Sequence, residues 1–194
     1  MTENKYQLVE IFHSLQGEGE RTGTPAVFVR FSHCNLSCSF CDTPYEEVNL
    51  ELEENELLEK IASFPGKSVI FTGGEPTLAL KPSLVDKLKK RGYFLAIETN
   101  GLLPVPPGID WITVSPKTEF ASIRQRSGSE LKIIFGTQRN LAEWLTLDFQ
   151  HFFLSPENGR NKLNEENNRR VAEYVKSHPE WRFTTQLHKA LGIR

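Results

Sequence analysis

The sequence predicts an α/β fold of one domain, residues 1–194, in which an incomplete β/α barrel has about six mostly parallel strands. Short apolar runs rich in Val, Ile and Phe alternate with segments of helical period, which is typical of a parallel sheet covered by helices. The length of 194 residues is at the upper end of one ordinary domain. A complete eight-fold barrel usually takes ~250 residues and one crossover unit ~30, so a partial barrel fits the length best.

Eight runs have the length and composition of strands, and the last is weaker than the others. They cover residues 6–12, 26–32, 68–72, 94–98, 111–115, 131–135, 151–154 and 182–184. Alternation along residues 26–32 places the odd-numbered apolar positions on one face and Arg30 on the other.

Four segments between these strands predict helices: residues 55–64, 82–91, 164–178 and a shorter one at 139–145. In the first, Leu57, Leu58 and Ile61 line one face, and the Pro65-Gly66 pair ends the helix. The polar segment 118–129 gives no clear helix, so we expect the barrel to be irregular there.

Composition excludes several classes of protein. Hydrophobic residues make up 38% and charged residues 25%, which argues against a disordered tail and against a membrane protein. The 23 Lys and Arg against 25 Asp and Glu leave a net charge of −2, so we expect no direct binding to nucleic acid. The polar start of the chain lacks the apolar region of a secretory signal, and we expect a cytoplasmic protein without membrane contact.

Polar motifs follow five of the predicted strands. They are the cysteine loop 34–41 and the motifs Gly73-Gly74-Glu75-Pro76, Thr99-Asn100-Gly101, Ser115-Pro116-Lys117 and Ser155-Pro156-Glu157-Asn158. Because the carboxyl ends of parallel strands share one rim, we expect all five motifs to meet in one site.

The three cysteines of the chain all lie in the pattern Cys34-x3-Cys38-x2-Cys41. Clustered soft ligands of this kind favour zinc, copper(I) or an iron–sulfur cluster. A closed structural zinc site needs four ligands, whereas a four-iron cluster held by three cysteines leaves one iron open to a substrate or cofactor. The pattern therefore favours a [4Fe–4S] cluster over zinc, and over cysteines that are merely structural.

The cysteine pattern resembles the cluster loop of radical S-adenosylmethionine (SAM) enzymes, and Gly73-Gly74-Glu75-Pro76 resembles their glycine-rich motif. Within that superfamily the chain is similar to the 7-carboxy-7-deazaguanine synthases, over nearly its whole length. The segments that carry this similarity are Leu15-Gln16-Gly17-Glu18-Gly19, Phe28-Val29-Arg30, Cys41-Asp42-Thr43, Glu98-Thr99-Asn100-Gly101, Ser115-Pro116-Lys117 and Gln186-Leu187-His188-Lys189.

The resemblance implies a radical SAM core and a reaction. A reduced cluster would cleave SAM, and the resulting radical would start the conversion of 6-carboxy-5,6,7,8-tetrahydropterin into 7-carboxy-7-deazaguanine, with release of ammonia. The resemblance also implies Mg²⁺, a flavodoxin- or ferredoxin-type reductant and a homodimer.

The resemblance assigns roles residue by residue. The cluster ligands are Cys34, Cys38 and Cys41, and Thr43 matches the position that binds magnesium. The residues implied for SAM are Phe40, Cys41, Asp42, Gly73, Gly74, Glu75, Gly101, Ser115, Pro116, Lys117, Ser155, Pro156, Glu157 and Asn158. The residues implied for the substrate are Leu15, Gln16, Gly17, Arg30, Thr99 and Arg194.

Structural explanations compete with several of these roles. Thr43 can cap a turn, Arg30 can serve a structural ion pair, and residues 15–17 can form a glycine-rich surface turn. For Glu75, the functional expectation is a carboxylate that accepts from the ammonium of SAM.

Two other functions remain open at the level of sequence. A small radical SAM activase, which installs a glycyl radical on a partner protein, would share the cysteine loop and the Gly-Gly-Glu-Pro turn. A non-catalytic zinc-binding module would need only the cysteines.

Overall fold

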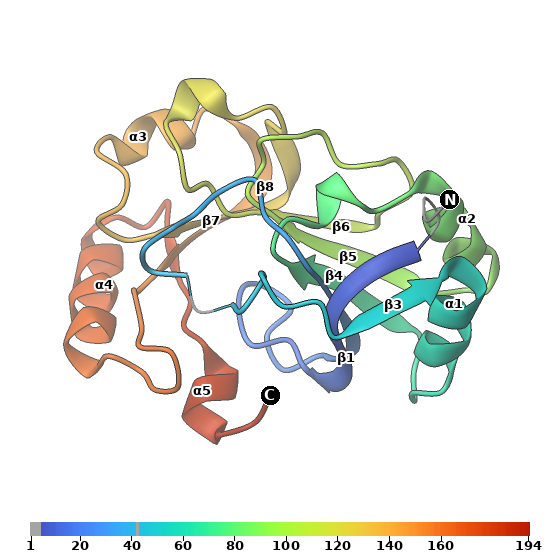
Figure 1. Cartoon of the computed structure of the whole chain (residues 1–194). Coiled ribbons are helices and arrows are strands. Elements are labelled where there is room, and N and C mark those ends of the chain that lie inside the picture. Colours follow the sequence, from blue (N-terminus) through green and yellow to red (C-terminus); the bar gives the residue numbers. More distant parts are fainter. Residues whose placement is uncertain (1–4, 42) are drawn as a thin grey trace.

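The computed structural model describes residues 5–41 and 43–194 (Figure 1). In these residues one sheet of nine strands has the order β3-β1-β2-β4-β5-β6-β7-β8-β9. The strands are β1 (Lys5–Leu15), β2 (Pro25–Phe31), β3 (Leu50–Glu53), β4 (Ser68–Gly73), β5 (Phe94–Thr99), β6 (Trp111–Val114), β7 (Ser127–Ile134), β8 (Asp148–Ser155) and β9 (Arg182–Phe183). Every neighbouring pair from β2 to β9 is parallel, whereas β1 pairs antiparallel with both β2 and β3.

This sheet confirms the predicted fold class. The parallel part comprises β2, β4, β5, β6, β7 and β8, to which the two-residue β9 is added. Strands β3 and β9 form the edges of the described sheet and do not pair with each other, so the barrel stays open. The sequence did not predict β3, because the four residues Leu-Glu-Leu-Glu have low intrinsic strand propensity and are held there by pairing with β1.

Helices flank the sheet at both ends. They are α1 (Glu54–Ala62), α2 (Pro82–Lys90), α3 (Leu141–Trp144), α4 (Glu165–Ser177) and α5 (Leu187–Leu191), with 3₁₀ turns η1 (Pro76–Leu78) and η2 (Phe120–Ser122). Helices α1 and α2 lie beside the early strands, and α3 and α4 lie at the opposite end of the molecule (Figure 1). None of the described helices is long and apolar enough to cross a membrane.

The predicted helices are confirmed within a few residues, and α5 was missed because five residues with no buried side chain have no apolar period. Polar side chains begin two of the helices. Glu53 and Glu56 form a reciprocal capping box at α1, and the Asn164 side chain accepts from the Asn167 N–H at α4.

The core lies between the sheet and the helices. Val27, Val29 and Phe31 of β2 are fully buried against Leu57 of α1 and Leu84 of α2 in one apolar cluster. The expected alternation along β2 is confirmed, because the intervening residues Phe28 and Arg30 line a cavity on the other face. This face of β2 therefore borders the cavity instead of the apolar cluster.

Candidate active site

Two adjoining cavities lie at the carboxyl ends of the parallel strands. The cysteine cavity has a volume of about 230 Å³ and is lined by residues that follow β2, β4, β5, β6 and β8. The polar cavity, of about 510 Å³, lies between the β1–β2 loop, β2 and the carboxyl-terminal segment. All five motifs thus contribute to one cavity, as expected from the shared direction of parallel strands.

The backbone at His33 sets the start of the cysteine loop. His33 has a φ of 65°, in the left-handed region, and its N–H donates to the Tyr45 carbonyl at 2.6 Å. Its carbonyl accepts from the Glu75 N–H at 2.9 Å. A Cβ on Gly74 would lie 1.8 Å from the His33 oxygen, so only glycine allows the two loops to come this close.

Glu75 joins three strand exits instead of facing a cavity. It is 1% exposed, and its carboxylate accepts from the Thr77 N–H at 3.1 Å, the Thr99 hydroxyl at 2.8 Å and the Asn100 N–H at 2.8 Å. The Asn100 side chain in turn donates to Asn35 Oδ1 in the cysteine loop at 2.8 Å. Glu75 therefore organises the rim, and the predicted contact of its carboxylate with an ammonium group stays a prediction.

The three cysteines share one cavity. Cys34 and Cys38 are half-buried, Cys41 is exposed, and all three line the cysteine cavity. In the described part of the chain, no three His, Cys, Asp or Glu side chains are grouped closely enough to surround one ion. Each cysteine of a four-iron cluster binds a different iron, so three thiols around one cavity are the donor set that such a cluster needs.

Burial raises the pKa of both Cys34 and Cys38. A backbone hydrogen bond partly opposes this rise at Cys34, and the positive charge of Lys117 partly opposes it at Cys38. The thiols are therefore protonated at neutral pH until a metal displaces the protons.

Lys117 carries a positive charge to the wall of the cysteine cavity. Its Nζ donates to the Ser115 carbonyl at 2.9 Å and to the Ser115 hydroxyl at 2.7 Å. Burial, together with the nearby charge of Lys132, lowers the pKa of Lys117 to about 8.

The structure places most of the other residues expected for SAM on the same wall. Those that line the cysteine cavity are Phe40, Cys41, Gly73, Gly74, Ser115, Lys117, Ser155, Pro156, Glu157 and Asn158. Gly101 and Pro116 are buried and do not line it, whereas Asp42 lies outside the described residues.

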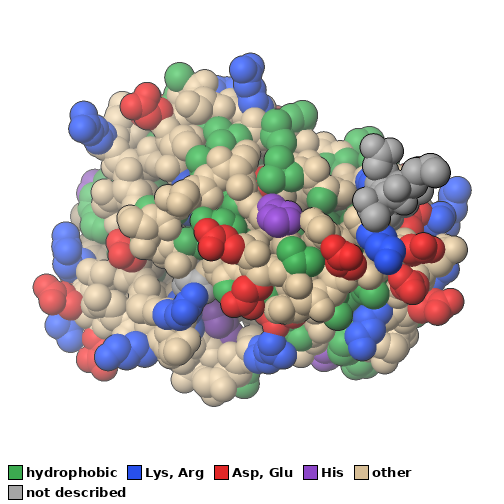
Figure 2. Space-filling model, viewed as in Figure 1, with side chains coloured by type: hydrophobic (Ala, Val, Ile, Leu, Met, Phe, Trp, Pro, Cys, Tyr) green, Lys and Arg blue, Asp and Glu red, His purple; other side chains and the backbone are tan. Residues whose placement is uncertain are grey.

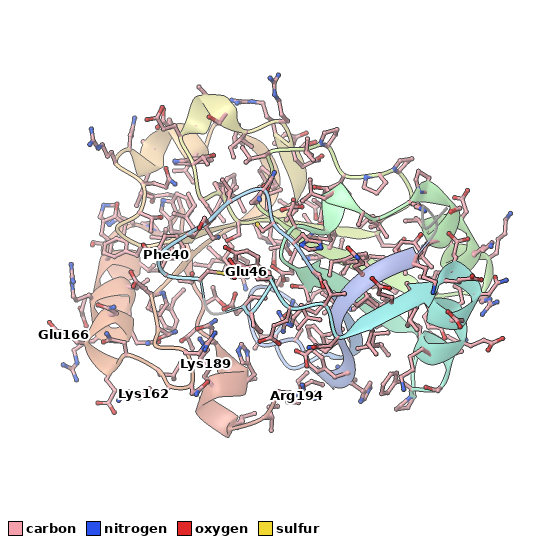
Figure 3. All side chains as sticks on the ribbon, in the orientation of Figure 1. Phe40, Glu46, Lys162, Glu166, Lys189 and Arg194 are labelled. Carbon is pink, nitrogen blue, oxygen red and sulfur yellow. The ribbon has the colours of Figure 1, made fainter. Side chains whose placement is uncertain are left out.

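The polar cavity brings together five of the six residues expected for the substrate, namely Leu15, Gln16, Gly17, Arg30 and Arg194. Thr99, the sixth, lines the cysteine cavity instead. Figure 3 shows Lys189 and Arg194 on the carboxyl-terminal segment, which closes one side of the polar cavity.

Arg30 forms an ion pair, as expected for a charged side chain in an apolar strand. Its Nε lies 3.0 Å from Glu10 Oε1, and Arg194 binds the other oxygen of Glu10. Both guanidinium groups lie over the ring of Phe12, at 5.6 and 5.2 Å. Because Arg30 also lines the polar cavity, the ion pair and ligand binding are compatible: Glu10 occupies only one edge of the guanidinium.

A common wall separates the cavities. Among the described residues it consists of Glu18, Thr43, Thr72, Glu98, Lys132 and Gln186, which line both. Lys132 is 6% exposed and forms ion pairs with Glu18 and, at 3.2 Å, with Glu98. Sequence reasoning missed Lys132, although a lysine inside an apolar strand is itself a signal of a buried charge with a partner.

Charged side chains of both signs are interspersed on the face shown in Figure 2.

Comparison with known proteins identifies the family. The model of the radical SAM superfamily matches residues 28–128. The 7-carboxy-7-deazaguanine synthase of Bacteroides thetaiotaomicron is 42% identical over 185 residues, which cover 95% of this chain and 97% of the relative. The enzyme of the same name from Caulobacter vibrioides is 39% identical and covers 97% and 99%. The chain belongs to the 7-carboxy-7-deazaguanine synthase family of radical SAM enzymes.

Structural similarity agrees with this family. The crystal structure of QueE from Escherichia coli superposes with a TM-score of 0.78 at 28% identity, over 95% of each chain. Family membership confirms the predicted radical SAM fold and its cofactors, a [4Fe–4S] cluster and SAM, and it favours the synthase over the activase and the zinc module.

Proposed function

We propose that the chain is a radical SAM lyase that converts 6-carboxy-5,6,7,8-tetrahydropterin into 7-carboxy-7-deazaguanine with release of ammonia. One observation carries this proposal: a cavity lined by three cysteines shares a wall of six described residues with a larger polar cavity. The cofactors and the substrate would therefore lie next to each other, on two sides of the same six side chains.

The cysteine cavity is proposed to hold the cofactors. Cys34, Cys38 and Cys41 would ligate the cluster, and the residues after β4, β6 and β8 would contact SAM. When bound, the cluster supplies the electron that splits SAM and so generates the radical that starts the reaction. The positive charge of Lys117 suits the carboxylate of the methionine moiety.

The polar cavity is proposed to hold the pterin. The edge of the Arg30 guanidinium that Glu10 leaves open would bind the substrate carboxylate. The Gln16 side chain and the neighbouring backbone would form hydrogen bonds with polar groups of the pterin ring. Thr43 lines both cavities, and its hydroxyl is a hard oxygen ligand of the kind that Mg²⁺ prefers. We therefore propose that Thr43 would bind the magnesium ion.

The remaining features are also proposals. Residues 1–194 would act as a single radical SAM domain, in the cytoplasm and as a homodimer. A flavodoxin- or ferredoxin-type protein would deliver the electron. Cys41 is exposed, which suits the approach of such a partner to the cluster.

The test is anaerobic reconstitution with iron and sulfide, followed by reduction in the presence of SAM, Mg²⁺ and 6-carboxy-tetrahydropterin. We expect 7-carboxy-7-deazaguanine and ammonia in equal amounts by mass spectrometry and an ammonia assay. The triple variant Cys34→Ala, Cys38→Ala, Cys41→Ala is the control and should bind no cluster. A protein that cleaves SAM but leaves the pterin unchanged would contradict the substrate, and a colourless protein with one zinc would contradict the reaction class.

A further inference from the structure

Glu98 occupies the point where the two cavities meet. It lies near the carboxyl end of β5, and its carboxylate contributes to the wall of both cavities. Its Oε1 accepts from Gln16 Nε2 at 2.9 Å, and its Oε2 lies 3.2 Å from Lys132 Nζ. Strand β5 is central in the sheet, so the carboxylate is held on a rigid element.

The charges around Glu98 come from three segments of the chain. Glu18 lies in the β1–β2 loop, Glu130 and Lys132 lie on β7, and Lys117 follows β6. Burial raises the pKa of Glu98, and Glu130 and Glu18 add to this effect, while Lys132 opposes it. The carboxyl group of Glu98 therefore takes up a proton more readily than a glutamate in water does.

We propose that Glu98 is the acid–base residue that moves the proton in the loss of ammonia, an inference that rests on the proposed function. The loss of ammonia removes a hydrogen from carbon and adds one to nitrogen, so a group able to carry a proton has to reach both. Among the described residues, the ionisable side chains common to both cavities are Glu18, Glu98 and Lys132.

The other two candidates are less suited to carry a proton. Burial lowers the pKa of Lys132, but the carboxylates of Glu18 and Glu98 outweigh burial and hold that pKa above its usual range. Lys132 is thus a persistent cation that is poor at releasing its proton. Glu18 forms the closer ion pair with Lys132, whereas Glu98 keeps one oxygen for a neutral donor, the Gln16 amide. The carboxylate of Glu98 is therefore held less tightly by the Lys132 cation than that of Glu18.

Glu98 alone can carry out both proton transfers that the loss of ammonia requires. Its carboxylate takes a proton from a ring carbon, and the electron pair of that C–H bond forms the new carbon–carbon double bond. The adjacent C–N bond breaks, its electron pair stays on nitrogen, and the proton passes from Glu98 to that nitrogen. Ammonia leaves, and Glu98 returns to its starting carboxylate form.

The test separates the radical step from the elimination. With substrate deuterated at the abstracted position, transfer of deuterium into recovered SAM measures the radical step, and ammonia measures the elimination. In Glu98→Gln we expect deuterium transfer within about threefold of wild type, but ammonia and product reduced by about 100-fold or more. Substrate binding to the unreduced protein, measured by calorimetry, should change little, because an amide has almost the shape of the carboxylate.

A matched control is Glu119→Gln, an exposed glutamate next to η2, which should leave both rates unchanged. Equal losses of deuterium transfer and ammonia in Glu98→Gln would overturn the inference, since they would indicate a positioning role. Unimpaired product formation would overturn it as well. Wild-type protein that forms no product would contradict the proposed function itself, and that result is seen before any variant is compared.

A second variant separates the loss of the carboxylate from a loss of folding. Glu98→Ala removes the carboxylate but leaves space for a small acid, so added formate should restore ammonia release in a concentration-dependent manner. Formate should have no effect on Glu98→Gln, in which the space is filled. Failure of formate to restore release in a folded, cluster-containing Glu98→Ala protein would contradict the proposal.

Discussion

The Asn100 side chain donates a hydrogen bond to Asn35 Oδ1 at 2.8 Å, and this contact ties the exit of β5 to the cysteine loop. The Asn100 side-chain oxygen also accepts from the Leu102 N–H at 3.0 Å, so both ends of one amide are used. The position of the loop that bears the cysteines is thus set by a residue far along the chain.

Replacement of Asn100 by Asp should loosen the cysteine loop selectively. The variant keeps an oxygen for the Leu102 N–H but places an acceptor against Asn35 Oδ1, which removes one hydrogen bond at a cost of about 1–3 kcal/mol. We expect the cluster to be lost to a chelator several times faster than in wild type, as followed by its visible absorption. Asn161→Asp, at an exposed position, is the control. Equal rates of cluster loss in the two variants would contradict a role for the Asn100–Asn35 contact.

Replacement of Gly74 by Ala should separate the glycine-rich turn from the start of the cysteine loop. The added Cβ would meet the His33 carbonyl at 1.8 Å, so backbone has to move, and we expect a loss of about 3 kcal/mol in the free energy of unfolding. Iron content after reconstitution should fall too. At Gly159 a Cβ would be 3.4 Å from its nearest neighbour, so Gly159→Ala should be close to neutral. Urea denaturation compares the two, and similar midpoints would be inconsistent with the crowding described.

Replacement of Arg30 by Gln should weaken substrate binding more than it slows turnover. The guanidinium is proposed to bind the substrate carboxylate in ground and transition states alike, so KM should rise by about 10- to 100-fold with kcat little changed. Steady-state kinetics with the carboxy-pterin measures both constants. Arg124→Gln, at an exposed position, serves as the control. A fall in kcat at constant KM would exclude this role for Arg30.

The stability of the protein should depend on the ionisation of Glu54. Burial raises the pKa of Glu54, but hydrogen bonds from Lys87, Ser83 and Tyr6 outweigh burial, and the pKa lies below its usual value. A carboxyl with a lowered folded-state pKa stabilises above its unfolded pKa, and this contribution is lost as the pH falls through the folded-state pKa.

Urea denaturation of wild type and Glu54→Gln should therefore differ by about 1 kcal/mol at pH 7, and the difference should vanish in acid. Glu59→Gln, an exposed position on the same helix, should match wild type at both pH values. A difference that grows on acidification would show that the sign of the linkage is wrong.

Much of the architecture could be predicted because each long strand is an apolar run with its own turn signal. The convergence of the five motifs followed from strand direction alone, since parallel strands bring their carboxyl ends together. Strand β3 and helix α5 could not be predicted, because their short segments have little propensity and exist through contacts with β1 and with the β1–β2 loop. The Leu187 N–H, for example, donates to the Gly17 carbonyl at 2.9 Å.

The candidate site was predictable where a motif is contiguous and not where it is assembled from distant segments. Glu10, Glu98 and Lys132 lie on three different strands, and nothing in their local sequence links them. Glu75 illustrates the same limit. Its motif is conspicuous in the sequence, but only the fold reveals that its carboxylate is already committed to Thr77, Thr99 and Asn100.

An unclosed barrel leaves two free strand edges, and both are poor templates for pairing with another chain. Along β3 the exposed positions are Glu51 and Glu53, so a second sheet brought alongside would meet repelling carboxylates. The opposite edge, β9, is only two residues long. The chain can therefore keep its sheet open to large cofactors and remain protected against edge-to-edge aggregation.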